Sequence, residues 1–165
     1  MRTLVLGIGN SILGDDGVGV RVAREVAARV EDGSVDVRDV SVDGLNLFDF
    51  ILGYDKLVVI DAIVTEAGAV GDVFRIVPEK ACDPSRSAIS PHHFNLATTI
   101  EIGKELFPDR IPRDVVLYAV ATEEATTVSE EMTREVEQAV PRAVDLVLGE
   151  IGFASGVARD VRSLR

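Results

Sequence analysis

Three side chains follow elements that could place them together for chemistry. Asp16 comes after a glycine-rich turn, Asp61 ends an apolar run typical of a strand, and His92 follows a Ser-Pro pair that is typical of a helix start. In open α/β folds, ligands gather at the carboxyl ends of strands, so all three could converge there. Two carboxylates and one imidazole form a donor set suited to a divalent metal such as nickel or zinc. The positive end of a helix would keep His92 neutral and able to ligate.

The glycine-rich stretch 4–19 begins as an apolar strand and ends with two adjacent aspartates before a helical pattern. Dinucleotide binding would need a third glycine three residues after Gly9, where the chain has Ile12. A phosphate-binding P-loop fails as well, because no lysine follows Gly14. Two carboxylates at this place would repel a phosphate and would suit a cation.

Structural roles compete with this chemistry. Asp16 could cap the following helix, and Asp15 would then be a solvated neighbour. Asp61 is harder to explain structurally, because a carboxylate at the end of four apolar residues costs free energy unless it is paired. Strand-end turns do use aspartate, however. His92 and His93 are the only histidines, and either could be a surface residue or a helix-start hydrogen bonder.

Composition narrows the class of protein. A chain of 165 residues predicts one domain, and an apolar share of 47% supports a folded core. The net charge of −11 argues against a nucleic-acid partner, and no apolar run reaches the ~18 residues of a membrane span. Cys82 is the only cysteine, so an internal disulfide and a Cys-x-x-Cys metal site are excluded. No cleavable signal pattern is visible at the N-terminus, so we expect a cytoplasmic location.

Alternating strand and helix patterns predict an α/β fold with a mostly parallel sheet. We expect strands near residues 3–8, 35–42, 57–61, 73–77 and 114–122, with a possible bulge at Asp39. Helices are expected at 16–30, near 45–52, from about 90 to 107, and from a Thr127–Glu130 capping box onward. Residues 1–151 would form the domain, and residues 152–165 a loose tail.

These motifs, taken together, resemble the nickel–iron hydrogenase maturation endopeptidases. The matching blocks are Leu-Val-Leu-Gly-Ile-Gly-Asn at 4–10, Gly-Asp-Asp-Gly at 14–17, Asp-Gly at 43–44, Val-Ile-Asp-Ala at 59–62 and Ser-Pro-His at 90–92. Their order and spacing cover roughly residues 1–150. The chain departs from the family pattern in a second histidine at position 93. It also lacks proline in the segment 121–124 that follows the last strand.

The resemblance implies a single-domain three-layer sandwich, with a twisted, mostly parallel sheet of about five strands between helices. It also implies a metal-dependent or aspartyl-type endopeptidase that removes a C-terminal extension from a hydrogenase large-subunit precursor. Residue by residue, it places Asp16, Asp61 and His92 on nickel, which the precursor supplies. We expect these three to be the catalytic and metal-binding residues, and the protein to be a monomer.

Two other functions stay open from the residues. The same three side chains could serve a nickel-binding assembly factor that does not cleave its partner. A small-ligand domain of the Rossmann type is the other, although the glycine spacing disfavours it.

Overall fold

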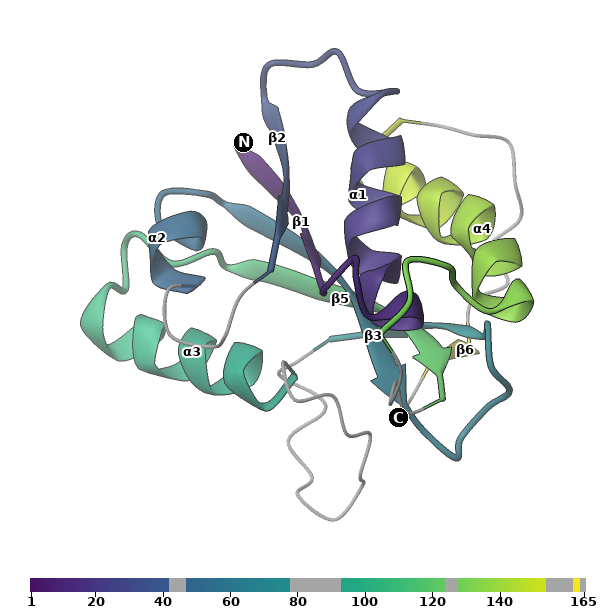
Figure 1. The fold of residues 1–165 in the computed structure, drawn as a ribbon. Coiled ribbons are helices and arrows are strands. Elements are labelled where there is room, and N and C mark those ends of the chain that lie inside the picture. Colours follow the sequence, from purple (N-terminus) through teal and green to yellow (C-terminus); the bar gives the residue numbers. More distant parts are fainter. Residues whose placement is uncertain (42–46, 78–92, 124–127, 154–161, 164–165) are drawn as a thin grey trace.

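A six-stranded sheet lies between two pairs of helices in the computed structural model, which describes residues 1–41, 47–77, 93–123, 128–153 and 162–163 (Figure 1). This architecture confirms the predicted α/β sandwich. The elements in chain order are β1 (Thr3–Ile8), the 3-10 helix η1 (Gly14–Gly17), α1 (Val18–Ala27), β2 (Val35–Val40), α2 (Leu47–Ile51), β3 (Lys56–Val64), β4 (Val73–Ile76), α3 (His93–Leu106), β5 (Asp114–Thr122), α4 (Arg134–Glu150) and β6 (Arg162–Ser163).

The strand order is β2-β1-β3-β5-β4-β6, and the first four strands are parallel. β4 runs antiparallel to β5, and the two-residue β6 pairs with β4. The pairing of β1 with β3 stops at Gly7–Ile60, whereas β3 and β5 stay paired to Val64–Thr122. The expectation that the third strand ends at Asp61 was therefore wrong, because β5 continues to pair with it after β1 has stopped.

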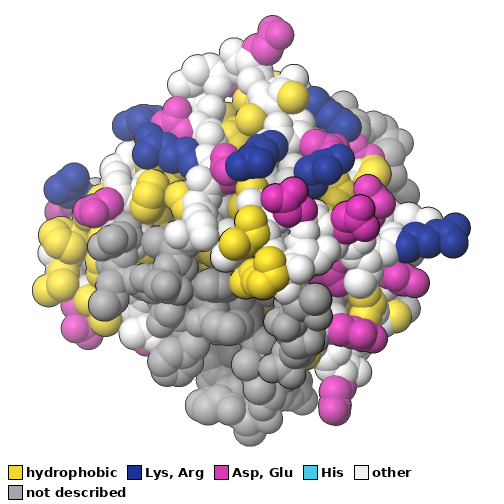
Figure 2. All heavy atoms as spheres, viewed as in Figure 1, with side chains coloured by type: hydrophobic (Ala, Val, Ile, Leu, Met, Phe, Trp, Pro, Cys, Tyr) yellow, Lys and Arg dark blue, Asp and Glu magenta, His cyan; other side chains and the backbone are white. Residues whose placement is uncertain are grey.

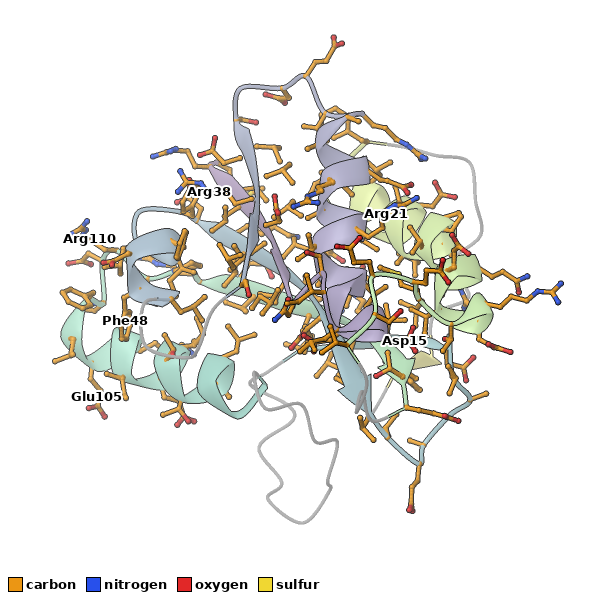
Figure 3. All side chains as sticks on the ribbon, viewed as in Figure 1. Asp15, Arg21, Arg38, Phe48, Glu105 and Arg110 are labelled. Carbon is orange, nitrogen blue, oxygen red and sulfur yellow. The ribbon has the colours of Figure 1, made fainter. Side chains whose placement is uncertain are left out.

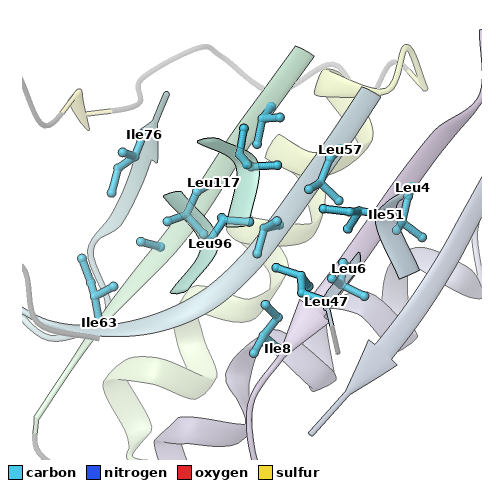
Figure 4. Packing of buried hydrophobic residues seen from close by; sticks show 14 of the residues in the cluster. Leu4, Leu6, Ile8, Leu47, Ile51, Leu57, Ile63, Ile76, Leu96 and Leu117 are labelled. Atoms are coloured by element: carbon cyan, nitrogen blue, oxygen red, sulfur yellow. The ribbon is translucent and has the colours of Figure 1, made fainter. Parts of the chain in front are cut away.

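Alternate residues of each strand point to opposite faces of the sheet, and each face has its own core. Leu4, Leu6, Leu57 and Leu117 pack beneath α2 and α3, as Figure 4 shows. On the other face, the neighbouring strand residues pack against α1 and α4. Fully burying one such aliphatic side chain stabilises the fold by about 1.5–3 kcal/mol, so the two cores hold both helix layers on the sheet.

Several predicted boundaries differ from the observed ones. The helix expected from residue 16 is interrupted: η1 comes first, and α1 begins at Val18. The last helix begins at Arg134, so the capping box at Thr127 and Glu130 was wrong; Thr127 itself lies outside the described residues. Pairing of β1 with β2 runs unbroken past Asp39, so that strand has no bulge there.

A half-buried ion-pair network fastens the end of α4 to the amino end of the sheet. The Glu150 carboxylate contacts Lys56 Nζ at 2.7 Å and Arg75 Nε at 3.0 Å, and it accepts a hydrogen bond from Tyr118 Oη at 2.8 Å. Lys56 also pairs with Asp114. Burial alone would raise the pKa of Glu150, but the bonds from Arg75, Lys56 and Tyr118 lower it to about 2. Burial and the Glu150 carboxylate raise the pKa of Tyr118.

The surface carries charges of both signs. Figure 2 shows Lys and Arg side chains interspersed with Asp and Glu over the coloured part of one face, with hydrophobic side chains between them. Such mixing does not make the continuous basic surface that a phosphate backbone requires. Within the described helices, none is both long enough and apolar enough to cross a bilayer.

Candidate active site

Asp61 is buried within β3, one residue beyond the last pair that β3 forms with β1. By strand alternation its side chain shares a face with Val59 and Ile63, which pack on the α3 side of the sheet. Its Oδ1 accepts the N–H of Ala62 at 2.8 Å. A carboxylate that is only 2% exposed keeps its charge at a cost unless it is well partnered.

Asp16 lies in η1, directly after the loop that leaves β1. Its Oδ2 accepts the N–H of Asn10 at 2.8 Å, which closes the loop of residues 10–16. Asp16 does not cap α1, because Gly17 occupies the N-cap position. Its side chain is half-buried, and it forms no ion pair with any residue that the structure describes. η1 also contacts β3, the strand that carries Asp61.

The glycines of this region let backbone segments touch. A Cβ on Gly7 would overlap the carbonyl oxygen of Gly19, and a Cβ on Gly19 would overlap the carbonyl oxygens of Ile8 and Ile60. α1 therefore begins in direct contact with the ends of β1 and β3. This close packing explains why the stretch is rich in glycine although its spacing does not fit a nucleotide site, and it brings η1 to the carboxyl edge of the sheet.

Asp15 is a residue whose role the sequence did not reveal. It is 7% exposed, so the expectation of a solvated neighbour was wrong. Its two oxygens accept hydrogen bonds from the backbone N–H of Thr133 at 2.7 Å and from Thr133 Oγ1 at 2.9 Å. Figure 3 shows Asp15 at the base of α1, on the side of α4. No sequence pattern signals a partner that lies 118 residues away.

A family model described as hydrogenase maturation protease matches residues 20–150 of the chain. The chain belongs to the hydrogenase maturation protease family. It is therefore a peptidase, and the resemblance seen in the motifs is confirmed. This membership favours proteolysis over an assembly factor that does not cleave.

Relatives and solved structures agree with the family assignment. The chain is 31% identical to the hydrogenase 2 maturation protease of Escherichia coli K12 over 124 residues, which are 74% of each protein. The structure of the hydrogenase maturating endopeptidase HybD from E. coli superposes with a TM-score of 0.76 at 29% identity, covering 92% of this chain and 94% of that one. HybD from Thermococcus kodakarensis gives 0.71 at 25% identity, with coverage of 91% and 99%.

The two histidines of this maturation protease are adjacent in the sequence, at positions 92 and 93. His93 is the first residue of α3, whereas His92 lies outside the described residues. α3 leads into β5 from the amino end of that strand, so its own beginning lies toward the carboxyl edge, where Asp16 and Asp61 are. Across the described part of the chain, no three His, Cys, Asp or Glu side chains form a metal-binding group. The assignment of Asp16, Asp61 and His92 as site residues stays a prediction.

The arrangement nevertheless defines what these residues can do. Asp61 approaches from within the sheet on the α3 face, and Asp16 approaches from the loop that leads to α1 on the other face. Two carboxylates at one edge of the sheet supply hard oxygen donors and negative charge for a cation. An imidazole from the start of α3 would add the borderline nitrogen donor that favours nickel or zinc over magnesium or calcium.

Proposed function

We propose that this maturation protease removes the C-terminal extension of a nickel-loaded [NiFe] hydrogenase large-subunit precursor, and that the nickel of the precursor is the anchor by which it recognises its substrate. The observation that supports this most is the position of Asp16. η1 holds it, half-buried and without a cationic partner in the described chain, against the strand that carries buried Asp61.

The donor set fits a metal that arrives with the substrate. Asp16, Asp61 and His92 would provide three ligands, which is fewer than a closed structural site uses. The remaining positions would be filled by cysteines of the precursor. A metal held in this way positions the scissile peptide beside the protease and can polarise its carbonyl or activate water. The two carboxylates would hold the cation, and the half-buried setting of Asp16 would exclude part of the surrounding water.

The test compares two Asp→Asn variants at opposite ends of the sheet. Asp16→Asn preserves shape and removes charge at the proposed site. Asp32→Asn makes the same change in the turn between α1 and β2, where Asp32 accepts the N–H of Ser34. Each variant is mixed with nickel-loaded and nickel-free precursor, and shortening is followed by mass spectrometry over time.

Wild type and Asp32→Asn should shorten only the nickel-loaded precursor. Asp16→Asn should be slower by at least about 100-fold, because the cation loses the charge of one carboxylate ligand. Equal shortening of nickel-free precursor by the wild type would contradict nickel recognition. Full activity of a folded Asp16→Asn variant would contradict the role of Asp16.

The nitrogen ligand can be assigned by treating the two histidines separately. Neighbouring helical residues lie about 100° apart around the axis, so His92 and His93 cannot both aim at one point without distortion. We expect His92→Gln to abolish nickel-dependent shortening and His93→Gln to retain most of it, after circular dichroism confirms that both fold. The reverse result would move the ligand to His93. Two active variants would leave the proposed site without a nitrogen donor.

A further inference from the structure

The adjacent aspartates of η1 serve different partners. A 3-10 helix has 3.0 residues per turn, so consecutive side chains point about 120° apart. Asp15 points to α4 and bonds Thr133, whereas Asp16 bonds Asn10 within its own loop. The two identical side chains are thus divided between the interior of the protein and the proposed site.

The Asp15 carboxylate accepts two hydrogen bonds from the N-cap residue at the start of α4. Thr133 is the N-cap residue of α4, but its own side chain makes no capping hydrogen bond. Its hydroxyl donates to Asp15 instead, and its backbone N–H donates to the same carboxylate. A buried carboxylate at the positive end of a 17-residue helix is electrostatically favourable. The contact therefore joins η1 to one of the longest and best-packed elements of the fold.

Backbone hydrogen bonds also join the start of η1 to the loop before α4. The N–H of Gly14 donates to the carbonyl of Ser129 at 2.5 Å, and the N–H of Ser129 donates to the carbonyl of Ile12 at 3.0 Å. Leu13 and Ser129 form a parallel β-bridge. These bonds hold the chain just before η1, and the first residue of η1 itself, against the loop before α4. Asp15 is the residue within η1 whose side chain bonds to α4.

We infer that Asp15 is a positioning residue: its two hydrogen bonds to Thr133 fix η1 on the start of α4 and thereby hold Asp16 in place for the metal of the substrate. This inference rests on the proposed function, because Asp15 would act only by holding Asp16 at the proposed site. η1 is only four residues long, so a shift at Asp15 moves the next residue with it. The anchor for the site is α4, whose far end is held by the Glu150 network.

The conservative variant Asp15→Asn tests whether Asp15 positions Asp16 or binds the metal itself. Asp15→Asn can keep both contacts, since its oxygen accepts the Thr133 N–H and its amide donates to the Thr133 hydroxyl. Asp15→Ala removes both. We expect Asp15→Ala to lower kcat/KM for nickel-loaded precursor by about 10- to 100-fold, mainly through a higher KM. Asp15→Asn should stay within about five-fold of the wild type, whereas Asp16→Asn should not.

A stability control separates positioning from simple loss of folded protein. Val26→Ala creates a cavity at a fully buried residue in the last turn of α1, at the end of that helix away from η1. It should lower the melting temperature and leave KM unchanged. In Asp15→Ala, the amides of Gly14 and Ser129 should exchange with deuterium faster than in the wild type. In Val26→Ala they should keep their relative protection, since their contacts are intact.

The results separate the two proposals. An unchanged KM in Asp15→Ala, with only a smaller folded fraction, would make Asp15 purely structural and overturn the inference. Equal losses in Asp15→Asn and Asp16→Asn would overturn it too, because Asp15 would then act through its charge. A fully active Asp16→Asn would overturn the proposed site and the inference together. An impaired Asp16→Asn beside a normal Asp15→Ala would overturn the inference alone.

Discussion

Buried and half-buried carboxylates have different partners at the two ends of the parallel strands. At the amino end, Glu150 is surrounded by Lys56, Arg75 and Tyr118, so its charge is balanced within the protein. At the carboxyl end, Asp15 and Asp16 form no ion pair with the described residues and accept hydrogen bonds from neutral donors instead. A buried or half-buried acid is stabilised by a cation or by N–H and O–H groups, and this chain uses each solution at a different end.

The difference indicates what each end is for. The amino end is electrostatically complete and holds the termini of β3, β5 and α4 together. The carboxyl end keeps negative charge without a balancing side chain at Asp16, so an incoming cation would gain from it. Variants at the two ends should therefore separate stability from activity.

The largest effect is expected from Asp61→Ala. Processing of the nickel-loaded precursor should fall by at least about 100-fold, because a proposed ligand is lost. The melting temperature should hold or rise, since functional sites keep acids at a cost in stability. Asp114→Ala, which removes an exposed acid from the amino end, is the matched control and should process normally. A large drop in the melting temperature of Asp61→Ala would show that Asp61 is a structural hydrogen-bond partner.

Glu150→Ala should have the opposite effect: it should lower stability and leave activity unchanged. Removing this acid takes away the ion-pair partner of Arg75 and leaves buried Lys56 with Asp114 alone, which should cost about 3 kcal/mol of unfolding free energy. The melting temperature should fall by about 10 °C for a chain of this size. The kcat/KM at 25 °C should match that of the wild type. A loss of activity greater than the loss of folded protein would mean that the amino end contributes to the site.

Acid should remove the contribution of Glu150 in a defined range. The folded state lowers the pKa of Glu150 from 4.5 to about 2, so its stabilisation is complete above the unfolded value. It is lost as the pH falls through the folded value. We expect the difference in unfolding free energy between the wild type and Glu150→Gln, measured with urea, to shrink by up to about 3 kcal/mol between pH 5 and pH 2. If the unfolding free energies of the two proteins changed in parallel with pH, the network would not depend on the charge of Glu150.

The smallest effect is expected from Tyr118→Phe. This change removes one hydrogen bond to Glu150 and leaves both ion pairs, so it should cost about 1 kcal/mol in urea unfolding. Processing should not change, because Tyr118 faces α4 rather than the proposed site. A cost as large as that of Glu150→Ala would show that the hydroxyl, and not the cations, holds the carboxylate.

Local patterns determined much of this protein by themselves. The bounds of β1 and β5 were predicted to the residue, because a buried strand needs an uninterrupted apolar run, and such runs end where polar residues begin. The valines of α1 recur every four residues, which indicates one buried helix face without knowledge of its partner. The motifs around Asp16, Asp61 and His92, taken together, also indicated the family that the family model confirms.

Only the tertiary structure decided features that depend on residues distant in sequence. The extension of β3 past Asp61 follows from its pairing with β5, and the start of α4 follows from a cap that Asp15 supplies from 118 residues away. The Glu150 network joins residues of three strands to the end of a helix. Apolar periodicity is local and can be seen in one segment, whereas the pairing of a buried charge depends on which segments the fold brings together. That is why the sequence predicted that Asp15 would be a solvated neighbour of Asp16, whereas the fold buries it against Thr133.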